Sequence, residues 1–195
     1  MNTRASKQYR SERGAATVEM ALVATLFFTL LFGVIELGRA MYIWNTVQHI
    51  TRQAARDATV TDFTNTAAMD AVRQNAIFRT DAGSLIAGAE ITDASVRISY
   101  FSMDSGGVLH EVAPTSTCPP KVVFDCNNNP NGSGCIRFVQ AQLCDPGSSK
   151  TCNAVKYQST LLGGFIPGFA NIPLPRSPVL MPAENLGFRS LTEAC

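Results

Sequence analysis

The feature that most constrains this chain is an apolar run near its N-terminus. Residues 20–35 contain no charged side chain, and residues 15–18 extend the run with Glu19 as its only charge. A helix of about twenty residues rises roughly 30 Å, which matches the hydrocarbon thickness of a bilayer. We therefore expect a single membrane-spanning helix over residues 15–36.

Two other interpretations of the apolar run remain open from the sequence. A secretory signal peptide also has a basic start, but its apolar part is usually shorter, and Glu36 and Arg39 lie where small cleavage-site residues are required. A buried core helix would have to bury large side chains on every side, which a small domain cannot easily do. These side chains are Phe27, Phe28, Leu30, Leu31 and Phe32.

Basic residues precede the run and predict its direction. Residues 1–14 carry Arg4, Lys7, Arg10 and Arg13 against a single acid, Glu12. Such a basic segment stays in the cytoplasm, so the rest of the chain is expected on the other side of the membrane. The whole chain has a net charge of only +1, which argues against nucleic acid as its partner.

Glu19 needs an explanation, because an acid inside a span costs about 2.5–3.5 kcal/mol at the bilayer centre and less near its edge. The simpler one is that Glu19 lies one turn inside the membrane edge and reaches the headgroup water. The other is a cut after Gly14, which would make Ala15 a free amine four residues before Glu19. The two charges would then share one helix face, and the carboxylate would also favour the positive end of the helix dipole.

A basic leader, a glycine, small apolar residues, a glutamate at the fifth position and an apolar helix form the pattern of type IV prepilins. Residues 13–60 resemble more narrowly the TadE-like family, the minor pseudopilins of bacterial tight-adherence (Tad, or Flp) pilus systems. Two departures stand out. Many relatives have a proline in mid-span, where this chain has residues 24–26 as Ala-Thr-Leu, and Met20 stands where an aromatic residue is frequent.

The resemblance implies cleavage between Gly14 and Ala15 by a prepilin peptidase, and charge compensation by Glu19 during assembly. It also implies a location in the bacterial inner membrane. Residues 1–14 would be a cytoplasmic leader, and the domain of residues 61–195 would be periplasmic or carried to a cell-surface pilus. The implied partners are the membrane, the peptidase, other pseudopilins or pilin subunits, and the assembly machinery.

Beyond the span, residues 37–60 are expected to continue the same helix as an amphipathic segment, so that one helix runs over residues 15–59. Tyr42 and Trp44 are expected near the membrane interface. Arg39 can pair with Glu36, a contact worth only tenths of a kcal/mol on an exposed helix. A stripe at helical spacing is expected to pack on a small sheet: Leu37, Met41, Trp44, Val47, Thr51, Ala54 and Ala58.

The rest of the chain predicts an α+β domain, in which the long N-terminal helix packs on a small antiparallel sheet of about four strands. A second helix is expected over residues 66–78, capped by Thr64 or Asn65 and burying Ala68, Met69, Val72 and Ala76. Strands are expected over residues 96–101, 108–112, 135–144 and 154–162, the first two joined by a glycine-rich turn. Residues 163–182 are expected to be loop.

Six cysteines occur after residue 117: Cys118, Cys126, Cys135, Cys144, Cys152 and Cys195. They form no CxxC pair and have no neighbouring histidine, so disulfides in an oxidising compartment are favoured over zinc. A bridge across the Asn-rich segment after Cys126 would stabilise the fold by about 2–4 kcal/mol. The sequence does not choose among 15 possible pairings. Cys195 is the cysteine expected to be free or to have a distant partner.

The sequence contains no phosphate-binding glycine motif, no nucleophile elbow and no metal-loop spacing. His49 and His110 fall in different elements, and each is interpreted as an ordinary polar residue. We therefore expect no enzyme, no cofactor and no metal. The prediction is a pseudopilin acting in pilus biogenesis and adhesion. The alternatives are a single-pass membrane-anchored periplasmic binding module and a secreted protein cut near Ala40.

Overall fold

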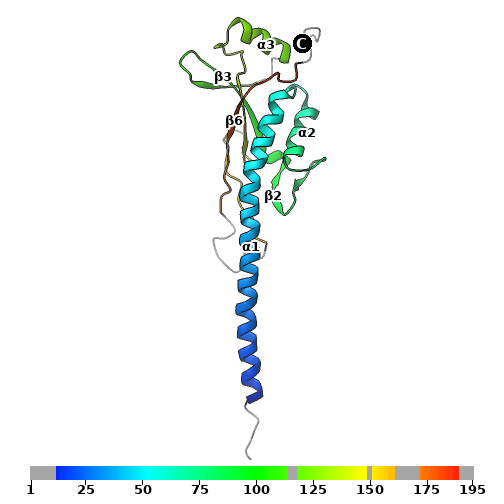
Figure 1. Cartoon of the computed structure of the whole chain (residues 1–195), viewed down its shortest axis with the longest axis vertical. Coiled ribbons are helices and arrows are strands. Elements are labelled where there is room, and N and C mark those ends of the chain that lie inside the picture. Colours follow the sequence, from blue (N-terminus) through cyan, green and yellow to red (C-terminus); the bar gives the residue numbers. More distant parts are fainter. Residues whose placement is uncertain (1–11, 114–117, 149–150, 161–171, 189–195) are drawn as a thin grey trace, which may run out of the picture.

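The computed structural model describes residues 12–113, 118–148, 151–160 and 172–188 (Figure 1). One long helix, α1 (Glu12–Val60), forms the axis of the molecule. Its lower half stands alone, whereas its upper half carries the rest of the described chain (Figure 1). The fold is α+β, as the sequence predicts.

α1 is 49 residues long. The helix is uninterrupted because the sequence has no proline before Pro114 and therefore no residue that removes an amide donor. It agrees with the helix predicted over residues 15–59, except that it begins three residues earlier. Residues 1–11, the larger part of the predicted leader of residues 1–14, lie outside the described residues.

A four-stranded antiparallel sheet packs against the upper part of α1. Its order is β4 (Leu109–Val112), β3 (Val96–Met103), β5 (Phe138–Leu143) and β6 (Val179–Pro182). Alternation along the two central strands turns one set of side chains toward α1. Three register pairs form this face: Val96 with Leu143, Ile98 with Ala141, and Tyr100 with Val139.

The predicted hairpin between β3 and β4 is confirmed. Asp104 shapes its turn, because its Oδ1 accepts the backbone N–H groups of Gly106 and Val108, each at 2.9 Å. The ring of His110 lies 3.0 Å from Asp104 Oδ2. These hydrogen bonds, first that of His110, lower the pKa of the Asp104 carboxyl.

Four smaller elements complete the fold: α2 (Thr66–Ala76), a hairpin of β1 (Ser84–Leu85) and β2 (Gly88–Thr92), and α3 (Pro119–Asn128). The second predicted helix is confirmed and ends at Ala76. Asn65 is its cap, since its side chain accepts the N–H of Ala68 at 3.1 Å. A short 3-10 helix, Asp93–Ser95, leads into β3.

Two predictions near the C-terminus are wrong within the described residues. Residues 154–160 form no strand there and make one isolated bridge, between Lys156 and Pro173. Conversely, β6 lies inside the predicted loop, where it pairs with β5 at the sheet edge. An edge position tolerates its terminal Pro182, because half of the backbone groups of an edge strand need no partner. Residues 161–171 lie outside the described part.

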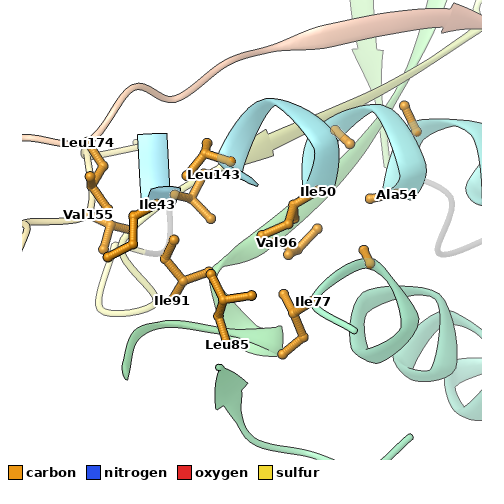
Figure 2. Close-up of a cluster of buried hydrophobic side chains, with 14 of the residues drawn as sticks. Ile43, Ile50, Ala54, Ile77, Leu85, Ile91, Val96, Leu143, Val155 and Leu174 are labelled. Atoms are coloured by element: carbon orange, nitrogen blue, oxygen red, sulfur yellow. The ribbon is translucent and has the colours of Figure 1, made fainter. Parts of the chain in front are cut away.

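The main core lies between α1, the sheet and the β1–β2 hairpin. Figure 2 shows Ile43, Ile50 and Ala54 of α1 in one cluster with side chains from the sheet and from the β1–β2 hairpin. The other labelled members are Ile77, Leu85, Ile91, Val96, Leu143, Val155 and Leu174. Burial of this set, at about 25 cal/mol per Å² of apolar surface, is what holds the domain to the helix.

The predicted packing stripe on α1 is half wrong. Its upper members, Val47, Thr51, Ala54 and Ala58, are buried, but Leu37, Met41 and Trp44 are exposed. The reason is that α2 lies beside only the upper end of α1 (Figure 1). Lower on α1, other elements cover fewer of its faces, so more of its side chains are exposed. The lower buried face runs instead through Glu36 and Ile43.

Candidate functional site

The candidate processing site lies in the first turn of α1. Gly14 and Ala15 are exposed and helical, although the sequence analysis expected the helix to begin only at Ala15. A Cβ added at Gly14 would meet nothing within 4 Å. The first four N–H groups of a helix have no intrahelical partner, so this turn unwinds at small cost. The bond between Gly14 and Ala15 is therefore accessible to an enzyme that needs an extended backbone.

Glu19 is exposed one turn above Ala15. Residues four apart on a helix lie on one face, so its carboxylate is near the position that an amine at Ala15 would occupy. No described residue forms an ion pair with Glu19. Gly14, Ala15 and Glu19 thus all lie near the N-terminal end of α1.

Above Glu19, α1 presents an apolar surface on all sides. The helix is long and apolar enough to cross a membrane, and none of its most apolar window is buried. Its two threonines leave no free donor, since Thr25 Oγ1 donates to the Ala21 carbonyl at 2.8 Å and Thr29 Oγ1 donates to the Thr25 carbonyl at 2.7 Å. Such internal satisfaction suits a lipid environment, where no water replaces a lost partner. The segment is a candidate membrane anchor.

Where the apolar surface ends, a cluster of polar side chains, most of them buried, joins α1 to the domain. We call it the exit cluster: Glu36, Arg39, Glu90, Tyr157 and Thr160. Arg39 donates Nη2 to Glu90 Oε2 at 2.9 Å, Nε to the Ala87 carbonyl at 2.8 Å and Nη1 to the Gln158 carbonyl at 2.7 Å. One guanidinium therefore holds the helix, the β1–β2 hairpin and the segment around Gln158 together.

Glu36 is the most enclosed member of the exit cluster, with no exposed surface. Tyr157 donates its hydroxyl to Glu36 Oε1 at 2.6 Å, and Thr160 Oγ1 lies 3.4 Å from Oε2. Arg39 lies 3.7 Å from Glu36 Oε1 and 5.0 Å from the centre of the Tyr157 ring. Burial, followed by the hydrogen bond to Glu36, raises the pKa of Tyr157 to about 12.

The sequence predicts only the Glu36–Arg39 pair of this cluster, as an exposed contact of little energy. In the structure that pair is the minor contact of a buried cluster. Two carboxylates there face one guanidinium, so neutral donors such as the Tyr157 hydroxyl must satisfy the remaining oxygens. A signal that could have indicated this is a charged pair directly after an uncharged span, where desolvation demands more partners.

All five described cysteines are disulfide-bonded, which supports an oxidising location. Cys126 is joined to Cys135, and Cys144 to Cys152. The first bridge closes the Asn-rich segment, as the sequence analysis considered. Cys118 is also bonded, and Cys195 lies outside the described residues.

One comparison with known proteins gave a match. A family model described as TadE-like protein matches residues 14–56. No curated protein and no solved structure matches the chain. The matched segment begins at Gly14, includes Ala15, Glu19 and the α1 members of the exit cluster, and ends within the upper half of α1. Over this N-terminal segment, about a fifth of the chain, the protein is similar to the TadE-like family.

Proposed function

We propose that this chain is a minor pseudopilin of a Tad (Flp) type IV pilus. In this proposal α1 anchors the chain in the bacterial inner membrane, with residues 1–14 in the cytoplasm and residues 61–195 in the periplasm. A prepilin peptidase cuts between Gly14 and Ala15. The mature chain acts in pilus biogenesis and adhesion by binding other subunits, not by catalysis.

The observation that carries the proposal is the placement of Gly14, Ala15 and Glu19 at the exposed end of an apolar helix, inside the segment that matches the family model. Cleavage would give Ala15 an α-amine with an ordinary pKa of about 7.7–8.0, which is largely protonated at neutral pH. That charge would neutralise Glu19 in the same chain or in a neighbouring one. The neutral pair would lower the cost of keeping a carboxylate in lipid.

Cleavage is tested by the intact mass of the membrane-extracted protein, from hosts with and without the peptidase. We expect Ala15 as the N-terminus only where the peptidase is present. Gly14→Val should block the cut. Gly33→Val is the matched control, because Gly33 also lies in α1 and a Cβ there also meets nothing within 4 Å. A leader that stays intact in a host with active peptidase would refute processing.

The role of Glu19 is tested separately from processing. Glu19→Gln should still be cut, but its recovery in sheared pili should fall at least tenfold, because the amine of Ala15 loses its counter-charge. Glu111→Gln, which changes an exposed acid on β4, is the control and should assemble normally. Normal recovery of the Glu19→Gln chain would contradict a pseudopilin role.

A membrane-anchored binding module is the second candidate, because the domain has an open cleft of about 620 Å³ between α2 and β3–β4. Its apolar lining includes Phe63, Met69 and Tyr100, and its polar lining includes Asp70 and Arg73. This function would not need Glu19. An unchanged phenotype of Glu19→Gln together with a lost phenotype of Arg73→Glu, which changes a partly exposed lining residue, would favour it.

A further inference from the structure

The β1–β2 hairpin lies beside α1 at the point where the helix leaves its apolar segment. Arg39 Nε binds the carbonyl of Ala87 in the hairpin turn at 2.8 Å. Gly88 lies beside α1, since an added Cβ would be in van der Waals contact with Ile43 Cγ1, at 3.5 Å. These two contacts fix the hairpin turn at the level of Arg39 and Ile43 on the helix axis. Figure 1 shows the hairpin beside α1.

This level can be compared with the edge of a bilayer. Ile35, the last residue of the uncharged run, lies four residues before Arg39 and therefore below it on the same helix face. At 1.5 Å per residue the two lie about 6 Å apart along the axis. The headgroup layer on each side of a bilayer is about 5–7 Å thick. If the hydrocarbon core ends at Ile35, which is itself half exposed, the hairpin turn reaches the headgroup layer.

The composition of the hairpin turn suits that layer. Residues 82–89 contain no charged side chain. Ile86 is 65% exposed at the turn, although its neighbour Leu85 and the nearby Ile91 are buried in the core. The adjacent acid, Glu90, is withdrawn into the exit cluster by Arg39. The hairpin turn therefore exposes a large apolar side chain, without a charged neighbour in residues 82–89, at the level where the uncharged segment of α1 ends.

We propose that the β1–β2 hairpin is a second membrane contact of this chain, in which Ile86 inserts into the headgroup layer of the bilayer that α1 crosses. The occupant of this surface is lipid. The inference rests on the membrane anchor of the proposed function, but not on cleavage or on pilus assembly. With α1 as the first contact, the hairpin fixes which side of the domain faces the membrane.

The test uses the full chain in phosphatidylethanolamine–phosphatidylglycerol vesicles, with tryptophan fluorescence as the readout. Trp44→Phe removes the single natural tryptophan. On this background, Ile86→Trp reports on the hairpin. Phe124→Trp reports on α3, at the opposite end of the domain (Figure 1), where Phe124 is 64% exposed and so is matched in exposure. Quenchers are lipid brominated near the headgroup end of its acyl chains and, in the aqueous phase, acrylamide.

We expect brominated lipid to quench the Ile86→Trp chain at least threefold more than the Phe124→Trp chain, and acrylamide to quench them in the reverse order. Ala89→Trp, at an exposed position on the same hairpin, should give intermediate lipid quenching and serves as a second reporter. Equal quenching of the hairpin and α3 reporters, or a hairpin reporter quenched by neither agent, would overturn the inference. Vesicle flotation separates the two proposals: a chain that does not float refutes the anchor itself, whereas a floating chain without lipid quenching refutes only the hairpin contact.

Discussion

Gly187 lies where the last described segment of the chain returns to the end of α1. The preceding residue, Leu186, is buried, and its N–H donates to the Thr59 carbonyl at 3.0 Å. Gly187 itself has a φ of +82°, and a Cβ there would lie 2.3 Å from the backbone nitrogen of Asp62. Both the dihedral angle and the close backbone approach therefore require glycine.

Gly187→Ala should lower the free energy of unfolding by more than the cost of placing alanine in a left-handed conformation, because the added Cβ also clashes with the backbone of Asp62. Gly107→Ala is the control, because Gly107 has a φ of +80° but nothing within 4 Å of an added Cβ. We expect about 1 kcal/mol for the control from the dihedral angle, and a further 1–3 kcal/mol for Gly187→Ala from the clash. Urea unfolding in detergent micelles measures both. Equal losses would mean that the Asp62 backbone moves aside freely.

Tyr157→Phe should lower the free energy of unfolding by about 1–3 kcal/mol, because buried Glu36 Oε1 loses a donor. Tyr42→Phe, at a 43% exposed tyrosine, should change it little.

The pKa of Tyr157 is raised from 10.0 to about 12, so the unfolded chain releases this proton first. Stability should thus fall as pH rises from about 10 to 12, and more steeply with Tyr157 than with Phe at this position. Parallel pH profiles of the two chains would contradict the burial of this hydroxyl.

Among the elements, α1 divides into a covered and an uncovered face. Ile50→Ala should cost about 2–5 kcal/mol, because Ile50 is fully buried in the main core (Figure 2). Met41→Ala should cost less than about 0.5 kcal/mol, since Met41 is 61% exposed. Unfolding of the two variants in micelles, against the parent chain, measures the difference. A larger loss for Met41→Ala would restore the stripe that the sequence predicts.

The elements that the sequence predicts well are those specified by local signals. α1 follows from the absence of proline, and α2 from its periodic apolar face and the Asn65 cap. β6 could not be predicted because residues 179–182 become a strand only by pairing with β5, a partner distant in sequence. α3 has a local signal in the sequence that indicates its start. Prolines at its first turn, after Cys118, are typical of a helix start.

The candidate site shows the same division. Gly14, Ala15 and Glu19 lie within one short segment, and the spacing of four residues alone predicts that Ala15 and Glu19 share a helix face. The exit cluster joins Glu36 to Tyr157 across 121 residues and Arg39 to Glu90 across 51. Contacts of such range are created by the packing of the whole domain, and no periodic pattern in either segment indicates them.

At the scale of the molecule, the exit cluster is where the anchor helix and the domain act as one body. The core above it joins them by apolar packing, whereas the cluster adds directional bonds at the point where the uncharged segment of α1 ends. Arg39 alone binds groups from two segments besides its own helix, and its side chain is only 15% exposed. Its planar guanidinium supplies several donors in a fixed geometry, which a lysine cannot reproduce.

Arg39→Gln should therefore loosen the whole lower part of the domain from the helix. Glu36 and Glu90 would remain buried without their cation, and breaking such a pair costs about 3–5 kcal/mol. Arg39→Lys should recover only part of this loss. Arg52→Gln, at an exposed position on the same helix, should have little effect. Limited proteolysis in vesicles should cut the β1–β2 hairpin at least tenfold faster in Arg39→Gln than in the parent chain or in Arg52→Gln. Equal cutting rates would show that apolar packing alone holds the hairpin to α1, since the charged groups would then be dispensable for its position.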